Sequence, residues 1–173
     1  MSEGETRQYF GKYRGTVINN IDPMQRGRIM VQVPDVAGLT PGSWALPCVP
    51  IAGTQQGTWF VPPIGALVWV EFEQGDPDHP IWTGCFWGSA AEVPALAAAG
   101  NPASPSIVLQ TQLQNGITIS DVPGPTGGIL IKNSTGAMIS ITEVGITISN
   151  GQGATINMTG PTVNINAGAL AVT

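Results

Sequence analysis

The sequence predicts an all-β protein in two parts, a small Greek-key barrel followed by a repetitive β domain. Three observations lead to this fold class. The 23 Gly and 15 Pro residues separate short runs of alternating apolar and polar residues, a pattern typical of strands joined by turns. No segment has a convincing helical period. The second half of the chain repeats every 17 residues and is nearly free of charged side chains.

Composition divides the 173-residue chain near residue 88. The first 88 residues hold five of the six Lys and Arg residues and all five Trp, whereas only Asp121, Lys132 and Glu143 are charged after residue 100. The Ala- and Pro-rich stretch between them suits a semi-rigid linker with room for one helical turn. We therefore expect four regions: an N-terminal arm over 1–10, the barrel over 11–88, the linker over 89–106 and the repetitive domain over 107–173.

The barrel part contains five expected strands, at Tyr13–Asn20, Arg28–Val33, Trp44–Val49, Ala66–Glu73 and Ile81–Trp87. In the second of them, alternation places Ile29, Val31 and Val33 on one face. Five strands in fewer than 90 residues fit a small barrel such as the OB-fold, whereas a sandwich needs about seven strands.

The repetitive part carries the most specific pattern of the sequence. Ile129, Ile146 and Val163 correspond at successive offsets of 17 residues, and so do Ile131, Ile148 and Ile165. Each repeat contains two apolar-polar-apolar triplets, and each triplet places two apolar side chains on one face of a strand. Repetition at a short period indicates stacked β-strands.

Such strands are too short for one chain to bury its apolar face alone. We therefore expect an obligate homotrimer, an intertwined trimeric β-helix (β-prism) in which each strand edge pairs with a neighbouring chain. About seven strands per chain, stacked at roughly 4.8 Å, give a rod on the order of 35 Å long. The predicted trimer core consists of Ile129, Ile131, Ile139, Ile141, Ile146, Ile148, Ile156, Met158, Val163 and Ile165.

The barrel part also resembles a known family. The residues that carry the resemblance are Gly15–Val17, the Asp22-Pro23 turn, the run Ile64–Glu73, and a loop containing Gly75, Asp76, Pro77, Asp78 and Pro80 that leads into Ile81–Gly84. They resemble the OB-fold of contractile-tail central spike proteins: phage baseplate assembly protein V, the phage T4 cell-puncturing protein and the VgrG proteins of type VI secretion. The resemblance implies that the barrel seats a trimer on a baseplate hub and that the β-helix projects as a spike.

The chain departs from this family in two respects. The linker is far too short for the lysozyme domain of the T4-type protein, and the lone His79 rules out the paired-histidine iron apex of other phage spikes. The chain ends in apolar residues whose strand edges would be unpaired. We therefore expect a separate tip protein of the proline-alanine-alanine-arginine repeat (PAAR-like) kind to contact Ala169, Leu170, Ala171, Val172 and Thr173.

The expected function is mechanical. The resemblance implies a homotrimeric central spike of a phage tail or related injection particle, made in the bacterial cytoplasm without a signal peptide, which punctures a target envelope. One alternative is a trimeric receptor-binding fibre or adhesin module. A less favoured one is an OB-fold nucleic-acid binder, because a net charge of −5 and few cations suit phosphate binding poorly.

The sequence contains no nucleophile elbow, phosphate loop or zinc-site spacing, so we expect no enzymatic activity, metal or cofactor. Asp76, Asp78 and His79 allow a metal or acid-base cluster, but their interleaved prolines favour a structural turn. Glu71 and Glu73 share a strand face, as paired glycosidase carboxylates do, but no second catalytic motif accompanies them, so we expect a solvated face.

Three further groups of residues leave their alternatives open. Arg26 and Arg28 indicate either a salt bridge to a hub protein or an exposed loop. The five Trp residues favour structural or hub-contact roles over base stacking. Cys48 and Cys85 are expected to be small buried hydrophobic residues in a reducing cytosol, with a disulfide as the alternative.

Overall fold

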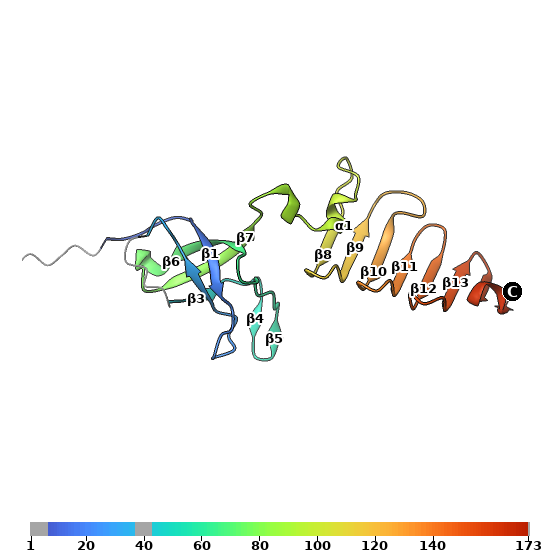
Figure 1. Ribbon diagram of the computed structural model, residues 1–173, viewed down its shortest axis with the longest axis horizontal. Coiled ribbons are helices and arrows are strands. Elements are labelled where there is room, and N and C mark those ends of the chain that lie inside the picture. The colour runs from blue at the N-terminus through green and yellow to red at the C-terminus, as the bar shows by residue number, and fades with distance from the viewer. Residues whose placement is uncertain (1–6, 37–42, 173) are drawn as a thin grey trace, which may run out of the picture. The chain divides into compact units, whose positions relative to one another are not determined.

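The computed structural model describes residues 7–36 and 43–172 of the chain. The chain divides into two compact units, residues 1–90 and 91–173, and we describe each by itself (Figure 1). Every sheet in the described residues is built from short strands, so the predicted all-β class is confirmed.

The first unit is a closed five-stranded barrel in the order β1-β2-β3-β7-β6. Only β3 and β7 pair in parallel, and the other neighbours are antiparallel. All five barrel strands expected from the sequence are present: β1 (Tyr13–Asn19), β2 (Ile29–Gln32), β3 (Trp44–Pro47), β6 (Leu67–Phe72) and β7 (Pro80–Phe86).

Alternation along the strands builds the barrel core. In β6 every second residue from Val68 to Phe72 is buried, and β1 and β2 follow the same rule. The most completely buried side chains are Val17, Ile29, Val31, Val68 and Val70. Tyr9, from the region expected to be an arm, is only 4% exposed and packs its ring 6.0 Å from that of Phe72. The described part of the arm thus belongs to the barrel.

Two small elements lie outside the barrel strands. A hairpin of β4 (Ala52–Gly53) and β5 (Gln56–Gly57) forms a separate two-stranded sheet, and a short 3₁₀ turn, η1, covers Glu73–Gly75. The backbone N–H of Tyr9 donates to the carbonyl of Gly75 at 2.8 Å, which ties the start of the described chain to this turn.

A partly buried ion pair holds the turn between β1 and β2. The Asp22 carboxylate accepts hydrogen bonds from the backbone N–H groups of Met24, Arg26 and Arg28, and it pairs with the Arg28 guanidinium at 2.6 Å. The Arg28 side chain also lies over the Trp44 ring. Arg28 is therefore engaged within its own chain, unlike the exposed or hub-bound residue that the sequence allowed. Arg26 is exposed.

This ion pair makes the barrel sensitive to acid. The hydrogen bond from Arg28 holds the pKa of the Asp22 carboxyl well below its ordinary value of 3.8. The unfolded chain therefore binds the Asp22 proton at a higher pH than the folded chain does, so stability is full above about pH 5 and falls as the pH decreases through 3.8 and below. We expect the melting temperature of the barrel, followed by circular dichroism, to drop between about pH 5 and pH 2.

The Asp22→Asn variant should be less stable at pH 7 and should lose much of this pH dependence. The decline that remains should come partly from Asp76, whose pKa is also lowered, chiefly by the backbone N–H of Asp78 and also by His79. Asp35→Asn serves as the control, because no ion pair of Asp35 occurs in the described chain. An unchanged pH profile in Asp22→Asn would contradict this account.

The second unit is one antiparallel meander of eight strands in sequence order (Figure 1). It follows two short helical turns, η2 (Ala90–Glu92) and α1 (Ala95–Ala98), and includes a third, η3 (Asn166–Gly168). Its strands are β8 (Ile107–Gln110), β9 (Gly116–Ser120), β10 (Gly128–Lys132), β11 (Met138–Ile141), β12 (Ile146–Ser149), β13 (Thr155–Thr159), β14 (Thr162–Ile165) and β15 (Leu170–Val172).

The 17-residue repeat corresponds to a pair of strands and their turns. Asn133 and Asn150 occupy the same place in successive repeats, and each side-chain oxygen accepts two backbone N–H bonds within its turn. Gly136 and Gly153 follow with φ of 96° and 103°, a conformation that favours glycine. The recurring Asn and Gly therefore fix identical hairpin turns.

The sheet differs from the expected intertwined rod. Each strand pairs with the strands before and after it in its own chain, and the sheet has eight strands where about seven were expected. The connections contain only two to seven residues, so each turn returns the chain directly beside the preceding strand. The expected pairing of each strand edge with a neighbouring chain is therefore wrong for these strands.

The predicted linker contains the expected helical turn, but part of it packs on the sheet. The backbone N–H of Leu96 in α1 donates to Oε1 of Gln110 in β8 at 3.0 Å.

Within the described ranges, no helix is long and apolar enough to cross a membrane.

Candidate assembly surface

Two columns of apolar residues run across one face of the eight-stranded sheet. Strand register aligns Ile129, Ile141, Ile146, Met158 and Val163 in the first column. It aligns Ile131, Ile139, Ile148, Ile156 and Ile165 in the second. The structure therefore places all ten residues of the predicted trimer core on a single surface, which we call the apolar face.

The apolar face is open to solvent in a single chain. Ile131 is 43% exposed and Ile148 39%, whereas Ile29 in the barrel is 0% exposed. Every hydrophobic residue that is buried in the described chain belongs to the first unit. The sheet thus has no hydrophobic core of its own. Exposing a contiguous row of isoleucines to water costs free energy, and burying that apolar surface would recover it. We therefore expect a partner to cover this face.

The other face of the sheet is mainly polar towards the C-terminus. The residues between the two columns there are Ser140, Thr147, Asn157 and Asn164. Thr147 and Asn157, on neighbouring strands, are joined by a side-chain hydrogen bond of 3.0 Å. Because polar side chains can remain hydrated, this face suits contact with solvent.

The columns begin earlier in the chain than the sequence repeat indicated. Ile107 and Ile119 extend the first column, and Leu109 and Ile117 extend the second. These four residues are 40% to 68% exposed. The triplet Ile117-Thr118-Ile119 has the same apolar-polar-apolar pattern as the later repeats, and this pattern could have identified the strand. The seven-residue connection after β9 breaks the 17-residue spacing, so a search for that spacing missed the triplet.

The C-terminal strand forms one edge of the sheet. β15 pairs only with β14, and Leu170 lies opposite Ile165. Ala169 and Leu170 are exposed, and Ala171 and Val172 continue the strand. Thr173, the last residue predicted to contact a tip protein, lies outside the described residues. The edge predicted from the sequence is thus present at β15.

The Gly75–Pro80 loop is a tight structural turn in this fold. The Asp76 carboxylate accepts the backbone N–H of Asp78 at 2.9 Å and contacts the His79 ring at 3.1 Å. Pro77 lies between them, and Pro80 begins β7. In the described part of the chain, no three acidic, His or Cys side chains are grouped closely enough to hold a metal ion. The geometry favours the turn over the metal cluster that the sequence allowed.

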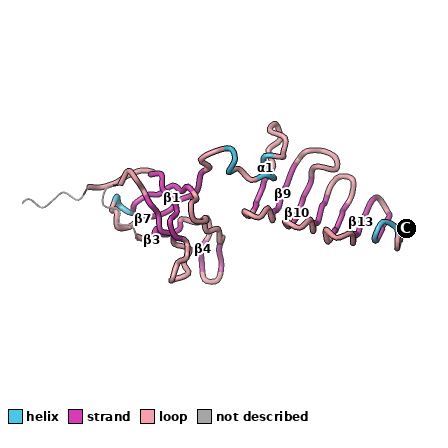
Figure 2. Tube along the Cα trace, viewed as in Figure 1, coloured by secondary structure: helices cyan, strands magenta, loops and turns pink. Residues whose placement is uncertain are grey.

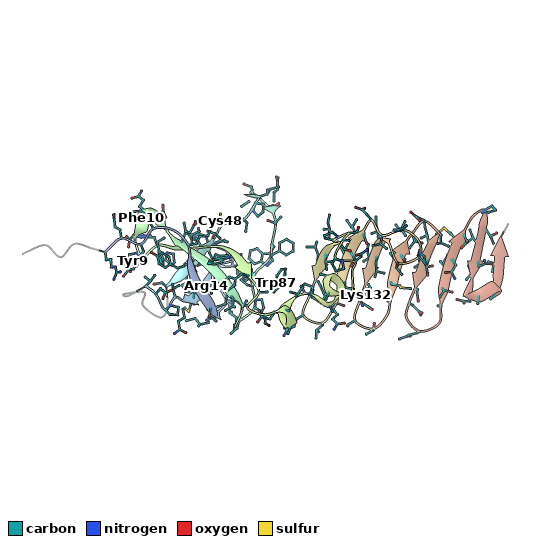
Figure 3. All side chains as sticks on the ribbon, turned by 90° about the horizontal axis from the view of Figure 1, so that it is seen from above. Tyr9, Phe10, Arg14, Cys48, Trp87 and Lys132 are labelled. Atoms are coloured by element: carbon teal, nitrogen blue, oxygen red, sulfur yellow. The ribbon has the colours of Figure 1, made fainter. Side chains whose placement is uncertain are left out.

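The remaining candidate residues of the barrel lie in separate places. Glu71 pairs with Lys12 at 2.8 Å and lies on the barrel wall, whereas Glu73 belongs to η1. Trp82 is buried, and its indole N–H donates to the carbonyl of Gly27 at 3.2 Å. Trp59 and Trp87 are more than 60% exposed (Trp87 is labelled in Figure 3).

The cysteine prediction requires a correction. Cys48 and Cys85 are both free, which excludes the alternative of a disulfide between them, but both are exposed rather than buried. Cys85 lies in β7, where the residues that face the core are Pro80 and Trp82. Beyond a bulge in the pairing with β6, Cys85 lies opposite Val68, and its side chain is nevertheless exposed.

Comparison with protein families matches both units. Residues 13–87 match the model of the type VI secretion system/phage-baseplate injector OB domain. Residues 106–171 match the phage baseplate V C-terminal trimerisation domain, and this range contains both apolar columns. No curated protein matches the chain. The two units are therefore similar to two domains of the same kind of particle.

Proposed function

We propose that the chain is a structural protein of phage baseplates or related injection systems and that it forms their homotrimeric central spike, because its two units match an injector OB domain and a baseplate V trimerisation domain. The injector OB domain associates with the baseplate, and the trimerisation domain joins three copies. In the proposed particle the barrels seat on a hub protein, and the three sheets form the rod that punctures the target envelope. The role is mechanical and involves no catalysis.

The observation that carries this proposal is the open apolar face. Three sheets packed with these faces inward bury the isoleucines of both columns in one shared core. The polar residues between the columns then face outward. Such a rod is rigid inside and hydrated outside, so it transmits axial force and leaves a membrane without becoming anchored in it.

Each end of the proposed spike has a candidate contact surface. Trp59 and Phe60 are each 66% exposed and Ile64 is 60% exposed, which supports hub seating through these barrel residues. At the other end, the free edge of β15 supports capping by a PAAR-like tip protein, because an unpaired strand edge invites pairing.

The proposal predicts where the chain ends lie in a particle. Particles assembled with an N-terminal or a C-terminal affinity tag would be labelled with gold and viewed by electron microscopy. We expect the C-terminal label on the tail axis at the distal end of the baseplate, and the N-terminal label closer to the hub.

The labelling also separates the spike from the competing fibre. Label on peripheral fibres would support a receptor-binding fibre and contradict the spike. Label that is absent from particles, with the untagged protein also missing from purified baseplates, would contradict both roles.

A further inference from the structure

The few charges of the sheet lie on its two opposite sides. Turns join the strands of the sheet on two opposite sides (Figure 2). Lys132, labelled in Figure 3, is the last residue of β10, on the side that carries the turns 111–115, 133–137 and 150–154. We call this side the basic rim. Asp121 directly follows β9, and Glu143 lies between β11 and β12, on the side that carries the connections 121–127 and 142–145. We call that side the acidic rim.

These charges do not meet within one chain. Lys132 pairs in register with Met138, and Glu143 lies five residues further along the chain. At about 3.3 Å per residue, the two side chains start roughly 16 Å apart along the strand direction. In the described chain, none of the three charged residues takes part in an ion pair. Glu143 instead accepts a hydrogen bond from the backbone N–H of Gly124 at 2.9 Å.

Threefold symmetry brings unlike rims together. Around a threefold axis every contact is heterologous, so one side of each sheet faces the opposite side of the next. A basic rim therefore faces an acidic rim at all three contacts. A twofold axis along the strand direction would instead place like rims against each other, and like charges repel.

The heights of the charges along the sheet also agree. β10, which carries Lys132, lies between β9 and β11, which precede Asp121 and Glu143. Neighbouring strands are about 4.8 Å apart, so both carboxylates lie about one strand spacing from the level of the lysine. A flexible lysine side chain reaches across this offset.

We propose that each contact of the trimer is closed by an ion pair between Lys132 of one copy and the Asp121–Glu143 rim of the next. This inference rests on the trimer of the proposed function and adds the sense in which the copies join. It also assigns a role to the one cation and two acids that are charged after residue 100.

Carbodiimide cross-linking tests the contact in the unmodified protein. The reagent joins an amine to a carboxylate as an amide, with loss of water, when the two groups touch. The chain has two lysines, and Lys12 already contacts Glu71 of its own chain at 2.8 Å, which provides an internal positive control. We expect covalent dimers and trimers on a denaturing gel, with a peptide joining Lys132 to Asp121 or Glu143.

Two variants at position 132 separate charge from reactivity. Lys132→Arg keeps the charge but does not form the amide, so trimers should remain while the cross-link disappears. Lys132→Glu places like charges at three contacts, and we expect about tenfold weaker trimer association in low salt. The difference should shrink in 1 M salt, and Asp121→Lys added to Lys132→Glu should restore much of the loss.

The outcomes distinguish this proposal from the one on which it rests. A trimer by light scattering that gives the Lys12–Glu71 product but no inter-chain Lys132 product would overturn the rim contact and leave the spike standing. A monomer by light scattering would overturn both. A Lys132 cross-link to an acid elsewhere in the trimer would also overturn the rim contact.

Discussion

Replacing Ile148 with Asp is expected to abolish the trimer. Ile148 lies in β12 near the middle of the second column, flanked in register by Ile139 and Ile156. In the proposed rod, threefold symmetry places three such residues at the same level of one apolar core. Three carboxylates would be desolvated there and would repel one another, at a cost of about 3–5 kcal/mol per chain.

The measurement is the solution mass by light scattering, with circular dichroism as a check on folding. Ile148→Asp should give monomers in which the barrel unit still unfolds cooperatively. The matched control is Ser140→Asp, which places the same charge on the polar face, opposite Thr147 of the same strand pair. Ser140→Asp should remain trimeric. If Ile148→Asp formed a trimer as stable as the wild type, the apolar face would not be the trimer core.

Replacing Gly128 with Ala is expected to disrupt the sheet unit from within. Gly128 begins β10 with φ of 79°, and an added Cβ would lie 2.0 Å from the carbonyl oxygen of Ile141. The obstacle is the backbone of the neighbouring strand, which has no rotamer to adjust. We expect a loss of about 3 kcal/mol or more in the free energy of unfolding of this unit.

Gly124→Ala provides the matched control in the connection that precedes β10. Gly124 has a similar φ of 85°, but nothing lies within 4 Å of an added Cβ. This variant should show only the backbone strain of about 1–2 kcal/mol. Chemical denaturation would separate the two, since the barrel unit serves as an internal reference. Equal losses in both variants would show that the close approach to Ile141 has no energetic consequence.

The sequence allowed the barrel to be predicted because its strands alternate cleanly. From Val68 to Phe72 the period of two separates buried from half-buried residues, and the same period defines β1 and β2. The β4–β5 hairpin escaped prediction because two-residue strands are too short to show a period. The burial of Tyr9 depends on long-range packing against Phe72, which local pattern does not encode.

The apolar face was also predictable, but the strand pairing was not. Period two fixed which side chains share a face, and this held for all ten core positions from Ile129 to Ile165. Whether neighbouring strands come from one chain or several depends on the turns. Asn133 and Asn150 close those turns through side-chain hydrogen bonds to the backbone. Both residues recur in the sequence repeat and favour tight turns, but an analysis of apolar periodicity alone does not consider them.

The hairpin repeat makes the length of the sheet adjustable in fixed steps. Each 17-residue repeat contributes two paired strands. The apolar residues of one repeat lie in register with those of the next, as Ile139, Ile148 and Ile156 do. Duplicating or deleting one whole repeat would therefore add or remove two strands, about 9.6 Å, without rotating the apolar face out of line. A one-residue insertion within a strand would instead turn the following side chains to the opposite face, so this sheet lengthens most simply by whole hairpins.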